Sequence, residues 1–195
     1  MQFFFKSISY VVIVFFFYGS SLCFSATNKI EIDEDLRRVL INAINDTDSF
    51  ADRFEAEVWL MDMSQRLKRR IKDPKKRLDL LKLVHYEAQR VDLPPELILA
   101  VIDIESNFDR WALSYVGARG YMQVMPFWLK EMNRPDDDLF TPEINVRMGC
   151  TILRFYVDKE KGDLTRGLAR YNGSLGRTKY PNKVFLALRK RWYRR

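Results

Sequence analysis

The sequence has few of the residues that would indicate metal, nucleotide or cofactor chemistry. Its 195 residues include two cysteines and one histidine, too few for a zinc site with Cys and His ligands. It has no glycine-rich loop of the P-loop or dinucleotide-binding type. Eight glycines, seven prolines and 47% hydrophobic residues exclude collagen-like and disordered chains. We therefore expect a folded domain that uses no metal and no organic cofactor.

No apolar run long enough to span a membrane occurs after the first residues, which excludes a protein with several membrane spans. Residues 1–25 have the pattern of a secretory signal: Lys6, an apolar stretch over 8–18, and small residues leading to a cleavage site after Ser25. A retained N-terminal anchor is the alternative. Lipid attachment at Cys23 is disfavoured, because a leucine precedes it where such sites have a small residue. This pattern predicts export to the periplasm or cell envelope.

Removal of that signal leaves Cys150 as the single cysteine. Its neighbours are apolar, so we expect a buried thiol rather than a catalytic nucleophile. The single histidine, His85, has no second ligand or acidic partner in a motif, and we expect it to lie at the surface or to pack.

Apolar residues recur at steps of three and four through most of the chain, which predicts helices. One helix is expected to begin at Asp73-Pro74 and another at Pro94-Pro95, because proline is favoured in the first helical turn. Later helices are predicted at 123–134, 142–160, 163–171 and 181–192. Since period-two runs of β-branched residues are absent, we expect an all-α fold, with at most a minor β-hairpin element.

The charged stretch 68–77 is the best candidate for a junction between segments. It divides the exported chain into an N-terminal helical extension, 26–75, and a main domain, 76–195. The formal net charge is +7, and basic runs stand at 68–70, 75–77 and 189–195. Such runs are either solvated helix faces or attract anionic wall polymer or membrane. Nucleic acid is disfavoured as a partner, because no binding motif for it is present.

The most informative single residue is Glu105. On a helical wheel it lies on the same side as Ile98, Val101 and Ile102, at the end of an apolar helix, whereas Asp103 is predicted to face solvent. A carboxyl against an apolar face is disfavoured as an anion, so its pKa should rise toward neutrality, as a general acid requires. The alternative is a glutamate at a fraying helix end that reaches water. No second carboxylate is evidently paired with Glu105, although ordinary glycosidases use two.

The segment 114–128 combines closely spaced glycines with Met, Gln and aromatic residues. The two glycines at 117 and 120 indicate a tight turn or a close backbone approach. Gln123 lies between Met122 and Met125. One interpretation is the start of a core helix with methionines filling gaps, and the other is a sugar-binding groove.

These segments, in this order, resemble the lytic transglycosylases with a soluble-lytic-transglycosylase (SLT) catalytic domain, the goose-type-lysozyme-like glycoside hydrolase family 23. The family's Glu-Ser pair followed by Phe is matched at 105–108, and its Gly-Ala-x-Gly-Leu-Met-Gln-x-Met-Pro motif at 117–126. Its Pro-x-x-Asn-x-x-x-Gly helix opening is matched at 142–149, and its Ala-Tyr-Asn element at 170–172. The resemblance covers about residues 76–190, and several ordered motifs make it specific.

Three positions depart from the family pattern. Tyr121 replaces a leucine, Trp111 stands where proline is common, and Arg170 replaces the alanine before Tyr-Asn. The first two could reshape a glycan groove. Arg170 is expected to add a charge beside the site, which puts substrate preference rather than reaction type in doubt.

The resemblance implies a lysozyme-like helical domain that cleaves the β-1,4 bond between N-acetylmuramic acid and N-acetylglucosamine in peptidoglycan. Glu105 would act as the single acid and base, and the 6-hydroxyl of the muramic acid would close onto C1 to leave a 1,6-anhydro end. The substrate would be glycan strands, no cofactor would be needed, and the enzyme is expected to be a monomer, with other cell-envelope proteins as candidate partners. The resemblance also implies a set of substrate-binding residues around Glu105: Ser114, Met122, Gln123, Met125, Tyr171 and Asn172.

Two alternatives remain open from the sequence. A hydrolase on the same fold would use water instead of the 6-hydroxyl. A non-catalytic scaffold that binds the wall would keep the fold without the reaction, but such a module has no need for a buried acid at Glu105.

Overall fold

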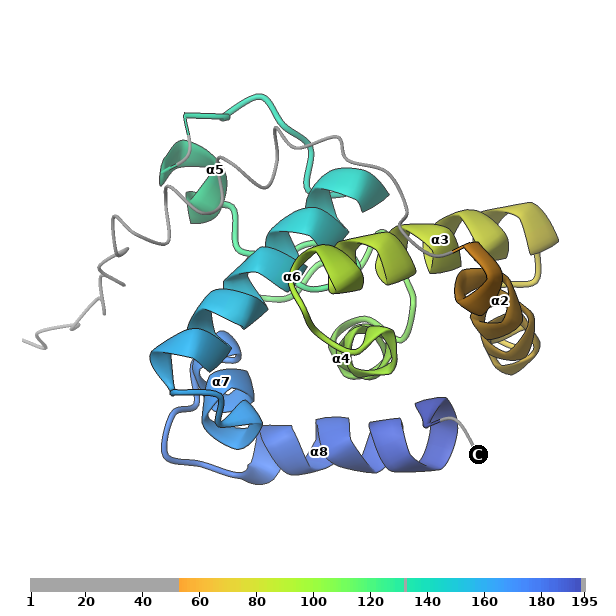
Figure 1. Ribbon diagram of the computed structural model, residues 1–195. Helices are drawn as coiled ribbons and strands as arrows, with labels where there is room; N and C mark the ends of the chain where they lie inside the picture. Colours follow the sequence, from red (N-terminus) through yellow and green to blue (C-terminus); the bar gives the residue numbers. More distant parts are fainter. Residues whose placement is uncertain (1–52, 132, 194–195) are drawn as a thin grey trace, which may run out of the picture. The chain divides into compact units, whose positions relative to one another are not determined.

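The computed structural model describes residues 53–131 and 133–193, which all fall in one compact unit and are mainly helical (Figure 1). The described part holds no β-strand, only isolated bridges joining Arg119 to Leu113 and to Val124. The all-α prediction is therefore confirmed for this part of the chain. The predicted signal, 1–25, and the first half of the predicted extension lie outside the described residues. The helices are α2 (Arg53–Leu67), α3 (Pro74–Arg90), α4 (Pro95–Glu105), α5 (Phe127–Glu131), α6 (Pro142–Lys159), α7 (Leu164–Tyr171) and α8 (Lys179–Ala187), followed by a short π-helix, η1 (Leu188–Trp192).

The helix starts follow the local sequence. Asp73 caps α3: its side chain accepts hydrogen bonds from the backbone N–H groups of Lys75 and Lys76, and proline occupies the first helical position. Proline also occupies the first position of α4 and of α6. The starts predicted at Asp73-Pro74 and Pro94-Pro95 are therefore confirmed, whereas the helix predicted at 123–134 is shortened to α5.

Helix α4 lies at the centre of the fold, and Figure 1 shows it almost end-on between α3 and α8. It packs against α3, α8 and η1. Every residue from Leu97 to Ile102 is almost completely buried, so this helix has no solvent face along that stretch.

The burial of α4 overturns the prediction that Asp103 faces solvent. Asp103 is only 8% exposed. Its carboxylate accepts hydrogen bonds from the guanidinium groups of Arg70, at 2.9 Å, and Arg191, at 2.5 Å, and from Trp192 Nε1, at 2.9 Å. A helical wheel separates a core face from a solvent face only when one side of the helix meets water, and around α4 both sides meet protein.

Helix α2 belongs to the segment that the sequence assigns to an N-terminal extension, but it shares the core of the following helices. Its residues Trp59, Met63 and Leu67 are buried in the same hydrophobic cluster as α3 and α4. The ring of Trp59 packs on His85, with centroids 5.0 Å apart, so His85 is a packing residue. The division at 75/76 stays a prediction.

The thiol of Cys150 is fully buried, and burial raises its pKa well above the usual range, which suits the predicted structural role. Among residues 53–131 and 133–193, no helix is both long and apolar enough to cross a membrane.

We expect Asp103→Asn to lower the free energy of unfolding by about 1–3 kcal/mol, because it removes the charge that two arginines and one indole N–H share. Urea denaturation followed by circular dichroism measures this. The control is Asp79→Asn, which removes an exposed carboxylate paired with Lys75 and should change stability by less than about 0.5 kcal/mol. Equal small effects for both variants would show that the Asp103 cluster does not stabilise the fold.

Candidate active site

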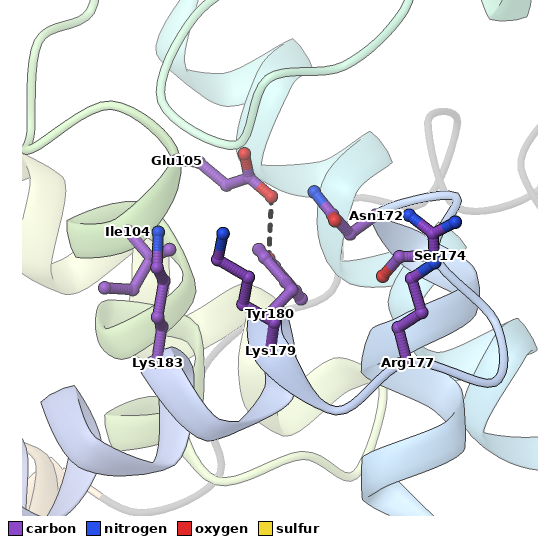
Figure 2. Close-up of a pocket in the computed structure, with 8 residues that line it drawn as sticks. All are labelled: Ile104, Glu105, Asn172, Ser174, Arg177, Lys179, Tyr180 and Lys183. Carbon is purple, nitrogen blue, oxygen red and sulfur yellow. Dashed lines mark hydrogen bonds between the residues drawn. The ribbon is translucent and has the colours of Figure 1, made fainter.

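Glu105 is the last residue of α4, so its side chain leaves the buried helix where the chain turns away. It opens into a pocket of about 390 Å³ between the end of α4, the loop after α7, and α8 (Figure 2). Among the described residues, Glu105 is the only carboxylate in the lining, and the other lining residues are Ile104, Asn172, Ser174, Arg177, Lys179, Tyr180 and Lys183. The described residues contain no cluster of His, Cys, Asp and Glu that could hold a metal ion.

The environment of Glu105 shifts its ionisation. Burial raises the pKa of its carboxyl to about 7, and a hydrogen bond from Tyr180 opposes this rise. The sequence-based expectation that the pKa of Glu105 moves toward neutrality is therefore confirmed. At neutral pH the carboxyl can both give and take a proton, which acid–base catalysis requires.

Tyr180 is the partner that the sequence analysis missed. It lies in the first turn of α8 and is buried, and its hydroxyl donates a 2.6 Å hydrogen bond to Glu105 Oε1 (Figure 2). Burial and the charge of Glu105 raise the pKa of Tyr180 well above its usual range, so it stays a donor. Tyr180 immediately precedes the helix predicted at 181–192 and belongs to none of the motifs, so only its position beside a predicted helix start could have drawn attention to it.

The loop between α4 and α5 is held against the helices by a few polar side chains. Ser106 Oγ donates to the carbonyl of Tyr121, at 2.8 Å. Asn145, on α6, accepts a hydrogen bond from Met122 N–H and donates to the carbonyls of Arg119 and Leu139. The Asn of the helix opening therefore clamps the turn that carries the second motif.

The glycine of that same helix opening makes room for the loop. A Cβ on Gly149 would lie 2.5 Å from Sδ of Met122, so only glycine lets the loop approach α6 this closely. Met122 is fully buried, and its carbonyl accepts a 2.7 Å hydrogen bond from the hydroxyl of Tyr171. Burial, with a smaller contribution from the charge of Glu105, raises the pKa of Tyr171 well above its usual range.

The remaining candidate residues occupy different positions. Asn172 lines the pocket with Glu105. Ser114 Oγ accepts the N–H of Ala118, and the amide of Gln123 donates to two backbone carbonyls within the loop, so both brace the loop. Met125 is half-buried against the core. The side chains of Met122, Ser114, Gln123 and Met125 do not line the pocket of Glu105, and the substrate-binding roles of all these residues stay predictions.

The positive charge of Arg170 is neutralised by an ion pair within the protein. Its guanidinium pairs with Glu160, which also pairs with Arg166. Trp111, by contrast, is 61% exposed and packs against Phe140 in a tilted arrangement, with ring centroids 5.6 Å apart.

We expect Tyr180→Phe to raise the pKa of Glu105 further above about 7, because the hydrogen bond that it removes favours the carboxylate. Carbon-13 NMR titration of the Glu105 carboxyl in labelled protein measures this pKa directly. Tyr193→Phe, at an exposed tyrosine, is the control and should leave it unchanged. A pKa that falls or does not move in Tyr180→Phe would contradict the geometry.

We also expect Glu105→Gln to stabilise the fold increasingly as the pH rises above about 4.5. The folded-state pKa of about 7 exceeds the ordinary 4.5, so the folded state binds more protons between these values and loses stability as pH rises through them. The gain of the variant should grow from near zero at pH 4 to about 2–3 kcal/mol at pH 8.

Denaturation at both pH values checks this expectation. The matched control is Glu143→Gln, an exposed glutamate in the first turn of α6, where a negative charge is favoured and its removal should not stabilise. A gain for Glu105→Gln that is independent of pH would show that the ionised carboxyl carries no penalty.

Comparisons with known proteins show which family the chain belongs to. Residues 82–189 match the Transglycosylase SLT domain family. Over 94 residues the chain is 35% identical to the membrane-bound lytic murein transglycosylase C of Histophilus somni. This match covers 44% of this chain and 26% of that protein. It is 33% identical over 100 residues to a transglycosylase of Enterobacteria phage PRD1, covering 48% of this chain and 37% of the phage protein.

A solved structure also matches: an inactive mutant of lytic transglycosylase Slt from Pseudomonas aeruginosa, at 30% identity and a TM-score of 0.45, over 51% of this chain and 17% of that one. The match to membrane-bound lytic murein transglycosylase C spans about a quarter of that relative's length. The family match itself extends over more than half of the chain and contains Glu105, Tyr171 and Tyr180. The chain therefore belongs to the Transglycosylase SLT domain family, as the motifs predicted.

Proposed function

We propose that this chain is a peptidoglycan lytic transglycosylase that uses Glu105 as its single acid and base. One observation carries the proposal: in this SLT-domain chain the described lining of the pocket contains one carboxylate, Glu105, and burial raises its pKa to about 7. The names of the relatives, murein transglycosylase and transglycosylase, support the same reaction class.

In the first step the protonated Glu105 gives its proton to the oxygen that joins N-acetylmuramic acid to N-acetylglucosamine. The bond from C1 to that oxygen breaks, and positive charge develops at C1. Glu105 is left as a carboxylate, and the hydroxyl of Tyr180, 2.6 Å away, stabilises this anion. Tyr180 thereby limits the rise of the Glu105 pKa that burial causes.

In the second step the carboxylate of Glu105 takes the proton of the muramic acid 6-hydroxyl while O6 bonds to C1. The product is a 1,6-anhydro end, and Glu105 is again protonated. Because the 6-hydroxyl belongs to the same sugar, its effective concentration can reach about 10⁵ M or more. A second carboxylate is then unnecessary. This suits a pocket in which Glu105 is the only carboxylate of the described lining.

The residues around Glu105 take roles that their positions allow. Asn172, in the pocket lining, would contact the sugar directly. Tyr171 would hold the loop beside the acid through the carbonyl of Met122. Ser114, Gln123 and Met125 would shape the glycan groove on that loop.

The place of action proposed is the periplasm or cell envelope, where glycan strands are found. Residues 1–25 would direct export, either as a cleaved signal or as a retained anchor, and one relative is named membrane-bound. We propose residues 76–195 as the catalytic domain, acting as a monomer, with 26–75 as an extension that could contact other envelope proteins.

We expect Glu105→Gln to lower glycan cleavage by about 10²–10⁴-fold or more, since the amide can neither donate nor accept the proton. Muropeptides released from purified sacculi are identified by mass spectrometry, and products one water lighter than reducing muropeptides are expected from the unaltered chain. The control is Asp79→Asn, a carboxylate on α3 outside the pocket, which should keep full activity.

The other outcomes separate the alternatives. Reducing products would identify a hydrolase. Full activity in Glu105→Gln would refute its catalytic role. Protein that pellets with sacculi and releases nothing would favour a wall-binding scaffold.

A further inference from the structure

Three cations share the pocket with Glu105. Lys179 and Lys183 lie on α8, Arg177 lies in the loop before it, and Figure 2 shows all three side chains extending from this one side of the pocket. All three residues are exposed. Within the described part of the chain none of them has an ion pair or a side-chain hydrogen bond, whereas arginines elsewhere, such as Arg66 and Arg90, pair with carboxylates.

Local stability does not explain this arrangement. Lys179 and Lys183 are four residues apart, so their like charges lie on one face of α8 and repel each other. Lys179 is also the first residue of that helix, where the helix dipole disfavours a positive charge. Both effects weaken α8, which suggests that the charges serve another purpose.

The cations do not serve to ionise the acid. A positive charge close to a carboxyl lowers its pKa, yet the pKa of Glu105 is raised to about 7, with burial as the largest cause. When Glu105 is protonated, the described lining of the pocket carries three positive charges and no negative charge. The ligand that complements such a wall is anionic.

We propose that Arg177, Lys179 and Lys183 form a carboxylate-binding subsite that selects glycans bearing anionic groups next to the scissile bond. This rests on the proposed function and specifies its substrate. In peptidoglycan, carboxylates come from two sources: the peptide stem, or the free lactyl group of a muramic acid without peptide. Chains of N-acetylglucosamine alone carry none, so they would lack this contact.

Exposed ion pairs are individually weak, so the effect is measurable but moderate. We expect Lys179→Gln/Lys183→Gln to weaken binding of the anionic glycan by about 3- to 10-fold relative to the neutral one. The loss should shrink at high ionic strength, because salt screens exposed charges. Lys179→Arg/Lys183→Arg keeps both charges and should largely restore the preference.

The experiment compares three soluble ligands by titration calorimetry, in the full chain carrying Glu105→Gln so that nothing is cleaved. The ligands are a peptide-bearing muropeptide tetrasaccharide, the same saccharide after amidase removal of the peptide, and N-acetylglucosamine tetrasaccharide. The matched control is Lys76→Gln/Lys82→Gln, which removes the same charge from exposed positions of α3 outside the pocket. Thermal unfolding confirms that each variant is folded.

A selective loss on the peptide-bearing ligand identifies the stem as the source of the carboxylate, and a selective loss on the peptide-free ligand identifies the lactyl group. Losses that are equal on all three ligands, or equal to those of the control, overturn the subsite. If neither anionic ligand binds, the subsite is overturned as well.

Cleavage of sacculi by the chain with Glu105 intact is measured in parallel. If no sacculi are cleaved but anionic ligands bind through Lys179 and Lys183, the proposed reaction fails while the subsite stands. If sacculi are cleaved but the lysines do not discriminate between ligands, the reaction stands and the subsite fails.

Discussion

The burial of α4 is the constraint on which the site depends. A helix that is apolar on every side must be surrounded by other helices, and the carboxyl at its end is then partly removed from water. That desolvation, opposed by one hydrogen bond from Tyr180, sets the pKa of Glu105 near 7. Without the packing of α8 and η1 on α4, Glu105 would be an ordinary surface glutamate.

Side chains from distant segments hold that packing in place. Asp103, two residues before Glu105, joins the end of α4 to Arg70 and to Arg191 and Trp192 of η1. On the other side of the acid, Asn145 and Gly149 of α6 let the loop of the second motif lie close enough for Tyr171 to reach the carbonyl of Met122. The hydrogen bonds of Asn145 and Tyr171 therefore hold the backbone of this loop in place.

The pocket combines a carboxyl whose pKa burial raises to about 7 with cations that stay exposed. The exposed cations have little effect on the pKa of Glu105, because water and salt screen their charges. In the proposed complex, the carboxylate of the glycan would pair with these cations while the glycosidic oxygen faces Glu105. The proposed subsite therefore places exposed cations for recognition beside a half-buried carboxyl for the reaction.

The sequence by itself determined the helical class, the starts of α3 and α4, the family and the upward shift of the Glu105 pKa, because caps, prolines, apolar periodicity and motif spacing are local properties. Only the tertiary structure decided which groups surround that acid. Asp103 was assigned to solvent because a wheel cannot show that a helix is enclosed on all sides. Tyr180 and the cations of α8 lie more than 70 residues from Glu105, and a contact at that distance is set by how helices pack.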